Sequence, residues 1–348
     1  MEYRQCGKSE FKFSVIGMGC WAFGGGDYWG PDSQPDTHSV VRAAFEAGIN
    51  YFDTAEAYNE GRSEIALGKA IAPIGRDQVY IGSKISPCHC YPAMLEQHCE
   101  ASLKRLGTDY LDLYMIHWPI HAHSIRHFTQ DESVINHPPL LEDALAAMEL
   151  LRAKGKVRQT GVSNFSRQRL MEIPAGTGVV VNELPYNLLC RAIELDTLPY
   201  CIQQGMGVIG YMTLMQGILT NRFKELQEVP AWQRRTRHFN ASGSTLSRHG
   251  ETGHEQPTQK TLDSLRLVAA QEGLSLAALA TRWVISHPAI TCALIGARSV
   301  NKLRENVLAA EGRLSPLTID RLNRLTAGLR DIMGNHFDYY ESKENDRT

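Results

Sequence analysis

VYIGSK at residues 79–84, MLEQHCEASLKRL at residues 94–106 and LDLYMIH at residues 111–117 are the stretches that decide the fold. The first and third are short apolar runs closed by a polar residue, as expected of strands buried on both faces. The apolar side chains of the middle stretch recur at helical spacing: Met94, Leu95, Cys99, Leu103 and Leu106. A strand, a helix and a second strand in this order predict two parallel strands of one sheet.

The same plan repeats along the chain. Further short apolar runs occur at residues 15–18, 49–53, 159–164, 179–183, 208–211 and 292–295. A second helical pattern runs through residues 141–151, and Ser275 is the expected N-cap of a helix that Pro288 ends. Eight strands alternating with helices favour a closed (β/α)8 barrel over an open sheet.

The polar residues that close these runs predict where the site lies. They are Asp53, Lys84, His117, Ser163, Asn164, Glu183 and Tyr211. Barrel enzymes keep their sites at the carboxyl ends of the strands, so these side chains are expected to converge on one rim. Two long segments, 119–138 and 214–260, leave the same rim after the fourth and seventh strands. We expect them to shape a substrate pocket or lid, with a disordered insertion as the alternative for the second.

Bulk composition excludes several functional classes. Of the 348 residues, 43% are hydrophobic and 21% charged, and the net charge is −2. This balance gives no support to binding of nucleic acid or anionic lipid. No apolar run reaches the roughly 18 residues of a membrane span, and the polar N-terminus and eight scattered cysteines indicate a cytoplasmic protein with free thiols. The oligomeric state is not predicted.

Residues 17–22, GMGCWA, match the dinucleotide-binding pattern G-x-G-x-x-A. That pattern requires a helix to open at once, so that its N-terminus binds the pyrophosphate. Here the chain continues FGGGDYWGP, and Gly26, Gly30 and Pro31 are incompatible with such a helix. We therefore interpret the stretch as the first strand-to-loop connection of the barrel.

Four segments resemble the aldo-keto reductase superfamily, in the same order. They are FDTAEAYNEGRSEIALGKAI (52–71), SLKRLGTDYLDLYMIHWP (102–119), GKVRQTGVSNFS (155–166) and IGARSVNKLRENV (295–307). The resemblance implies one barrel domain over residues 1–348, with residues 1–13 as a hairpin that plugs its bottom. Residues 335–348 are expected to form a solvated tail.

The resemblance assigns a catalytic tetrad of Asp53, Tyr58, Lys84 and His117. Carbonyl reduction needs a hydride on carbon and a proton on oxygen. A phenol near its ordinary pKa of about 10 is a weak acid at neutral pH, and a neighbouring lysine ammonium makes Tyr58 a better one. Asp53 is expected to pair with Lys84, and His117 to hydrogen-bond the substrate oxygen.

Cofactor contacts are likewise implied by the resemblance. Ser163 and Asn164 are expected to hydrogen-bond the nicotinamide carboxamide, and Tyr211 to stack on its ring. Where relatives have Ser-Pro after that tyrosine, this chain has Met212 and Thr213. The further expected contacts are Gly19, Cys20, Trp21, Asp53, Leu214, Gln216, Gly217, Ile295, Gly296 and Ala297.

Charge around the cofactor gives two more expectations. Arg298 and Lys302 lie at a predicted helix N-terminus that favours the 2′-phosphate of NADPH, with Glu305 and Asn306 beside the adenine. Glu183 stands where relatives have Gln, and a carboxylate there favours the oxidised, positively charged ring. Reduction of a small carbonyl with NADPH is the favoured function. Oxidation of an alcohol or sugar, and a cofactor-sensing regulatory subunit, stay open.

Trp21, Tyr58, His117 and Trp118 are the expected substrate contacts. Two groups suggest a metal site: Cys88-His89-Cys90 with His98-Cys99, and the histidines 117, 121, 123 and 127. Neither has the spacing of a common zinc site, so no metal is predicted. Residues 234–237, RRTR, are interpreted as a solvated face that is able to meet an anionic substrate.

Overall fold

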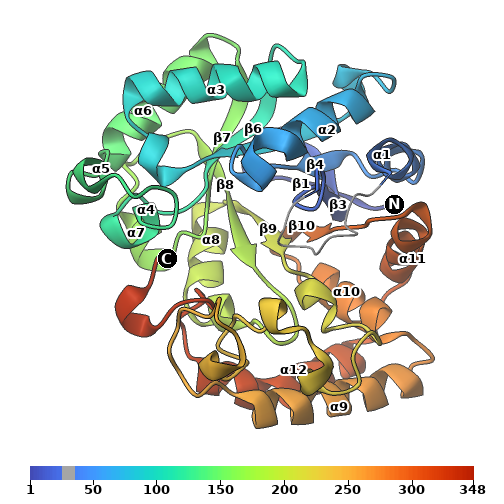
Figure 1. The fold of residues 1–348 in the computed structure, drawn as a ribbon. Coiled ribbons are helices and arrows are strands. Elements are labelled where there is room, and N and C mark those ends of the chain that lie inside the picture. Colours follow the sequence, from blue (N-terminus) through green and yellow to red (C-terminus); the bar gives the residue numbers. More distant parts are fainter. Residues whose placement is uncertain (26–35) are drawn as a thin grey trace.

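The computed structural model describes residues 1–25 and 36–348, and its centre is a closed barrel of eight parallel strands (Figure 1). The strands are β3 (Ile16–Gly19), β4 (Tyr51–Asp53), β5 (Tyr80–Ile85), β6 (Leu111–Ile116), β7 (Val157–Ser163), β8 (Val179–Pro185), β9 (Gly207–Tyr211) and β10 (Ile290–Ile295). Each pairs with its neighbour in the chain, and β10 closes on β3. The predicted (β/α)8 barrel is confirmed.

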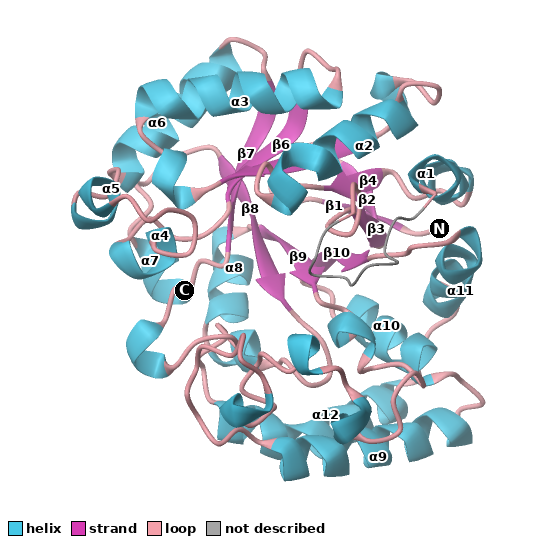
Figure 2. Ribbon diagram, in the orientation of Figure 1, coloured by secondary structure: helices cyan, strands magenta, loops and turns pink. Residues whose placement is uncertain are grey.

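Helices surround the barrel (Figure 2). They are α1 (Thr37–Glu46), α2 (Arg62–Ile71), α3 (Pro92–Leu106), α6 (Leu141–Ala153), α7 (Arg167–Met171), α8 (Thr197–Gln204), α10 (Leu276–Ser286) and α11 (Val300–Ala310). Two further helices, α9 (Glu255–Gln271) and α12 (Pro316–Met333), pack against each other. Gly68 of α2 has a packing role, since a Cβ there would lie 2.2 Å from the backbone oxygen of Leu106 at the end of α3.

A hairpin of β1 (Tyr3–Gln5) and β2 (Lys12–Ser14) covers the amino-terminal end of the barrel. Its side chains Phe11 and Phe13 are buried among inward-facing residues of the strands. Phe13 stacks on Tyr51 with ring centroids 4.3 Å apart. The hairpin expected over residues 1–13 is therefore confirmed, and it leaves the carboxyl ends of the strands as the accessible rim.

The two long rim segments carry short helical turns. Residues 119–138 form α4 (Ala122–Ile125) and α5 (Glu132–Asn136), while residues 214–254 contain a series of 3-10 turns before α9. Phe239 and Val229 of the second segment are fully buried. This segment is thus packed onto the barrel, and the alternative of a disordered insertion is wrong.

The expectation of a solvated C-terminal tail is also wrong. Phe337 and Tyr339 are buried, and Asp338 binds the guanidinium of Arg347 through both carboxylate oxygens, at 2.6 and 2.8 Å. The Arg347 guanidinium carbon lies 3.9 Å from the centroid of the Trp118 ring. Residues 335–348 therefore form part of the rim beside the loop after β6.

Directly after β3, residues 21–24 form a turn, and within the part of the chain that the structure describes the next helix, α1, begins at Thr37. Gly26, Gly30 and Pro31, on which the rejection of a pyrophosphate-binding helix partly depended, lie outside the described residues. Within residues 1–25 and 36–348, every helix is too short or too polar to cross a membrane.

Candidate active site

A buried ammonium group is the centre of the site. The Lys84 side chain is 0% exposed, and its Nζ lies 2.7 and 2.6 Å from the two carboxylate oxygens of Asp53. The same Nζ donates to the hydroxyl of Tyr58 at 3.2 Å and lies 3.3 Å from Oε1 of Glu183. Burial lowers the pKa of Lys84, but the charges of Asp53 and Glu183 outweigh burial and raise it, so the ammonium stays charged.

Local backbone geometry positions Tyr58. It begins a 3-10 turn (Tyr58–Gly61) in which Asn59 and Glu60 have positive φ angles of 51° and 58°. The side-chain amide of Asn59 donates to the backbone oxygens of Trp21 and Phe23, at 2.9 and 2.7 Å. Asparagine is among the residues that tolerate this conformation best. These bonds fix the turn so that the phenol faces Lys84.

The pKa of Tyr58 differs from the sequence-based expectation. Burial raises the pKa of the phenol, Lys84 lowers it, and Asp53 and Glu183 raise it again. The net direction is upward, because burial is the largest effect and the two carboxyl groups oppose the ammonium. Lys84 therefore acts as expected on Tyr58, but it does not by itself make the phenol more acidic than free tyrosine.

His117 lies beyond the end of β6, with its ring 5.4 Å from the Tyr58 ring in an edge-on arrangement. Burial lowers its pKa well below the ordinary value, and the positive charge of Lys84 lowers it further. The imidazole is thus neutral at pH 7. Its buried Nδ1 has no hydrogen-bond partner among the described residues. A neutral imidazole donates through one ring nitrogen and accepts through the other, as orientation of a carbonyl oxygen requires.

The carboxyl group of Glu183 also lies beside the Lys84 ammonium. Burial raises the pKa of Glu183 well above its ordinary value, the neighbouring Asp53 carboxylate raises it further, and Lys84 only partly compensates. Burial also raises the pKa of Asp53, but Asp53 lies closer to Lys84. Of the two carboxyl groups, Glu183 therefore holds a proton more readily than Asp53 does. The raised pKa opposes the expectation of a negative charge at Glu183 beside the cofactor, because one ammonium does not fully compensate two buried carboxylates.

One cavity of about 1310 Å³ opens beside this cluster. Its lining includes nearly all of the predicted contacts: Gly19, Trp21, Asp53, Tyr58, His117, Trp118, Ser163, Asn164, Glu183, Tyr211, Met212, Leu214, Gln216, Gly217, Ile295, Gly296, Ala297, Arg298, Lys302, Glu305 and Asn306. The cavity runs from Tyr58 and His117 to the beginning of α11. Its volume exceeds that of most small-molecule sites, as a dinucleotide with a substrate requires.

One wall is held by hydrogen bonds between neighbouring strand ends. The Tyr211 hydroxyl donates to the side-chain oxygen of Asn164 at 2.7 Å, and the Asn164 amide donates to the backbone oxygen of His117 at 3.0 Å. Asn164 has a φ angle of 64°, which turns the chain at the end of β7. Oε2 of Glu183 is buried without a hydrogen-bond partner among the described residues.

The opposite end of the cavity is cationic. Ser299 caps α11 through its side chain, and Arg298 and Lys302 lie beside this N-terminus. The Lys302 ammonium is 2.7 Å from Glu305, with both side chains more than half exposed. Exposed pairs of this kind are weak, so Lys302 is available to a phosphate group.

Comparison with known proteins agrees with this arrangement. The model of the aldo/keto reductase family matches residues 15–327. Aldo-keto reductase YhdN of Bacillus subtilis is 33% identical over 316 residues, which cover 87% of each chain. The chain belongs to the aldo/keto reductase family.

Two more distant matches extend over most of this aldo/keto reductase. The NADH-specific methylglyoxal reductase of Escherichia coli is 28% identical over 334 residues, covering 89% of this chain and 93% of that one. The crystal structure of an aldo/keto reductase from Klebsiella pneumoniae in complex with NADP and acetate superposes with a TM-score of 0.67. It is 27% identical and covers 99% of this chain and 98% of its own.

One predicted contact of this aldo/keto reductase does not face the cavity. Cys20 is fully buried, and its thiol donates to the backbone oxygen of Met18 at 3.5 Å. Its neighbours Gly19 and Trp21 line the cavity instead. Side chains alternate in extended backbone, so the residue between two cavity-lining positions points away.

Several rim residues were not predicted from the sequence. Arg222, Arg248 and Arg347 line the cavity. In the RRTR stretch, Arg235 lines the cavity, whereas Arg237 is buried and donates to the backbone oxygen of His336. The interpretation of that stretch as a solvated face is therefore wrong. Arginines clustered beside a predicted rim are the signal from which these pocket residues could have been predicted.

Proposed function

We propose that this aldo/keto reductase reduces small aldehydes and ketones with NADPH, and that Tyr58 donates the proton to the carbonyl oxygen. The observation that carries the proposal is the Tyr58 hydroxyl lying 3.2 Å from the buried Lys84 ammonium, at the mouth of the cavity. Charge develops on the carbonyl oxygen during reduction. A phenol that is hydrogen-bonded to an ammonium group and lies beside a neutral imidazole is suited to donate a proton to that oxygen as the charge develops.

The residues along the cavity fit NADPH. Ser163, Asn164 and the partnerless Oε2 of Glu183 offer hydrogen bonds to a carboxamide, and Tyr211 offers an aromatic surface. Arg298 and Lys302 offer positive charge to a phosphate. When bound, NADPH supplies the hydride. Because Ser163, Asn164 and Tyr211 lie at the carboxyl ends of the strands, they would hold the cofactor at the same rim as Tyr58.

Each residue of the tetrad then has a separate task. His117 holds the carbonyl oxygen by a hydrogen bond, and Tyr58 transfers its hydroxyl proton to that oxygen as the carbon is reduced. Lys84 stabilises the phenolate that remains, and Asp53 keeps the ammonium in place through two hydrogen bonds. Solvent then restores the proton to Tyr58.

The raised pKa of Glu183 supports reduction as the preferred direction. A neutral Glu183 resembles the glutamine of relatives, since it both donates and accepts a hydrogen bond. It adds no negative charge that would favour the oxidised cofactor. The substrates we propose are small carbonyl compounds, including the 2-oxoaldehydes that the name of the Escherichia coli relative indicates.

Steady-state oxidation of NADPH in the presence of carbonyl compounds tests the proposal. Methylglyoxal and 4-nitrobenzaldehyde are the first substrates, and each is assayed with NADPH and with NADH. We expect repeated turnover, a higher kcat/KM with NADPH, and faster reduction than alcohol oxidation at neutral pH. A single slow turnover would indicate a cofactor-sensing subunit, and faster oxidation of alcohols or sugars would indicate a dehydrogenase; either result overturns the proposal.

A further inference from the structure

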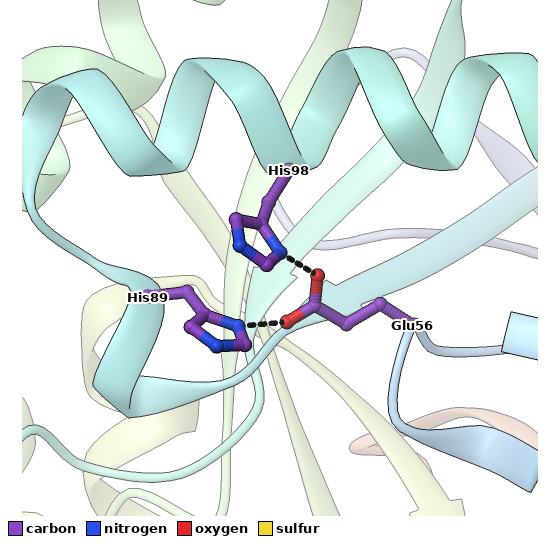
Figure 3. A group of neighbouring side chains, drawn as sticks. All are labelled: Glu56, His89 and His98. Carbon is purple, nitrogen blue, oxygen red and sulfur yellow. Dashed lines mark hydrogen bonds and ion pairs between the residues drawn. The ribbon is translucent and has the colours of Figure 1, made fainter. Parts of the chain in front are cut away.

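Three side chains outside the cavity converge on one point. Glu56 lies in the loop between β4 and Tyr58, His89 ends the 3-10 turn Pro87–His89, and His98 lies on α3 (Figure 3). Nδ1 of His89 is 2.8 Å from Oε1 of Glu56, and Nδ1 of His98 is 2.7 Å from Oε2. Both imidazoles therefore approach the same carboxylate, one at each oxygen, from two different elements.

The carboxylate of this group is ionised. Burial raises the pKa of Glu56, but hydrogen bonds from His89, His98 and the Ser86 amide outweigh burial and lower the pKa well below its ordinary value. The Glu56 side chain is only 6% exposed, whereas those of His89 and His98 are 31% and 30% exposed. The group is thus a buried negative charge covered by two imidazoles that solvent reaches.

The two imidazoles lie against each other. Their ring centroids are 3.8 Å apart and their planes are inclined by 22°. This stacking directs both Nδ1 atoms to the same side, towards Glu56 (Figure 3). Imidazole binds metal ions through a ring nitrogen, so both rings present a possible ligand atom on this side.

We propose that Glu56, His89 and His98 bind one divalent transition-metal ion, with Zn²⁺ as the probe that tests the site. Two histidines and one glutamate form a recognised zinc ligand set that leaves a fourth position open. Their donor atoms all lie within 4.8 Å of one another. Bonds of about 2.0–2.1 Å in tetrahedral geometry place ligand atoms roughly 3.3 Å apart. The present distances from His89 and His98 to Glu56 are about half an ångström shorter than this, so binding requires the donor atoms to separate and the two rings to turn towards the ion.

The remaining requirements of a metal site are met nearby. The side chains of His89 and His98 are partly exposed, so an ion can reach them from solvent. The Ser86 amide donates to Oε1 of Glu56 at 2.9 Å and orients the carboxylate, as outer hydrogen bonds do in known metal sites. Binding displaces the Nδ1 protons, so affinity is expected to fall as the pH is lowered.

The site differs from the one that the sequence suggested. Cys88 and Cys90 are buried, and neither belongs to the group. Glu56 precedes Tyr58 by two residues, so a metal there would contact the loop that carries the proposed proton donor. The proposal concerns binding alone and stands or fails independently of the proposed function.

Metal uptake by the purified full-length chain, treated first with a chelator, tests the proposal. Competition with a fluorescent Zn²⁺ indicator is expected to give one bound ion per chain. Glu56→Gln and His98→Gln are each expected to weaken binding on the order of tenfold or more, since even outer-sphere changes cost 10–100-fold. His123→Gln, an exposed histidine of α4, is the matched control and should leave binding unchanged.

Two further readouts keep the result decisive. Co²⁺ binding should give the visible absorption of a nitrogen- and oxygen-ligated ion, without an intense sulfur-to-metal band. If Glu56→Gln does not fold by circular dichroism, His89→Gln replaces it, because that side chain is partly exposed. No stoichiometric uptake, uptake insensitive to these variants, or a sulfur-to-metal band would each overturn the proposal.

Discussion

Replacement of Glu183 by Gln tests the protonation state of the buried cluster. Oε1 of Glu183 lies 3.3 Å from Nζ of Lys84, which both carboxylate oxygens of Asp53 already contact. Glutamine has the same shape and cannot ionise. If the folded protein holds a proton on Glu183, the exchange changes little in the structure but removes a group whose protonation varies with pH.

The magnitude follows from proton linkage. The pKa of Glu183 is raised above 4.5 in the folded protein, so between pH 4.5 and that raised pKa the folded state binds more protons than the unfolded chain. The stability that this proton contributes is present below pH 4.5 and is lost as the pH rises towards the folded pKa. The slope is about 1.4 kcal/mol per pH unit. For a folded pKa above pH 7.5, the wild type loses roughly 2.7 kcal/mol relative to Glu183→Gln between about pH 5.5 and pH 7.5, and a smaller loss locates a lower folded pKa.

Urea unfolding followed by tryptophan fluorescence measures this difference in the cofactor-free protein. The free energies of unfolding are compared at three pH values. The comparison requires that both proteins have the same m-value, which shows that they unfold in the same way. Glu10→Gln, an exchange at a side chain that is 78% exposed, measures what any Glu-to-Gln change contributes. A difference between wild type and Glu183→Gln that stays constant with pH would show that Glu183 is ionised in the folded state, and the reasoning would be refuted.

Three further substitutions probe other parts of the site. Lys84→Met leaves the buried carboxyl groups without their cation, so we expect loss of turnover and a decrease in the free energy of unfolding of about 3–5 kcal/mol at neutral pH; urea unfolding measures it, and a change under 1 kcal/mol would contradict it. Arg298→Ala should weaken NADPH binding roughly 10–100-fold, as loss of a charged hydrogen bond does, and leave NADH binding nearly unchanged in fluorescence titrations; equal losses for both would argue against a phosphate contact. Arg347→Met removes the partner of Asp338 and should raise KM for aldehydes more than it lowers kcat. Hydrogen exchange in residues 335–348 should also become faster. Lys343→Met is the control, and an unchanged KM for Arg347→Met would exclude the tail from the pocket.

The sequence predicted the barrel and most of the rim because both depend on local patterns. Each strand is a short apolar run closed by a polar residue, and parallel strands of a closed barrel bring those residues together whatever the loops do. Ser163, Asn164 and Glu183 reach the cavity for this reason. Cys20 was predictable as well, since alternation assigns it to the face opposite Gly19 and Trp21.

The features that the sequence did not predict depend on contacts between residues that are distant in the sequence. Phe337 and Tyr339 lie in a polar segment, and only tertiary packing buries them. The raised pKa of Glu183 requires the distance to Lys84, which lies 99 positions earlier in the chain by their residue numbers (183 − 84). Glu56 shows no metal-ligand spacing to either histidine, because the three side chains meet only when α3 packs beside the barrel.

Turnover of Tyr58→Phe tests the central claim most directly. The exchange deletes only the hydroxyl that lies 3.2 Å from Lys84, so NADPH binding should persist at nearly wild-type affinity. We expect kcat for 4-nitrobenzaldehyde to fall by about 10²–10⁴-fold, the usual contribution of a positioned general acid. A variant that binds NADPH and reduces the aldehyde at the wild-type rate would contradict the assignment of Tyr58 as the proton donor.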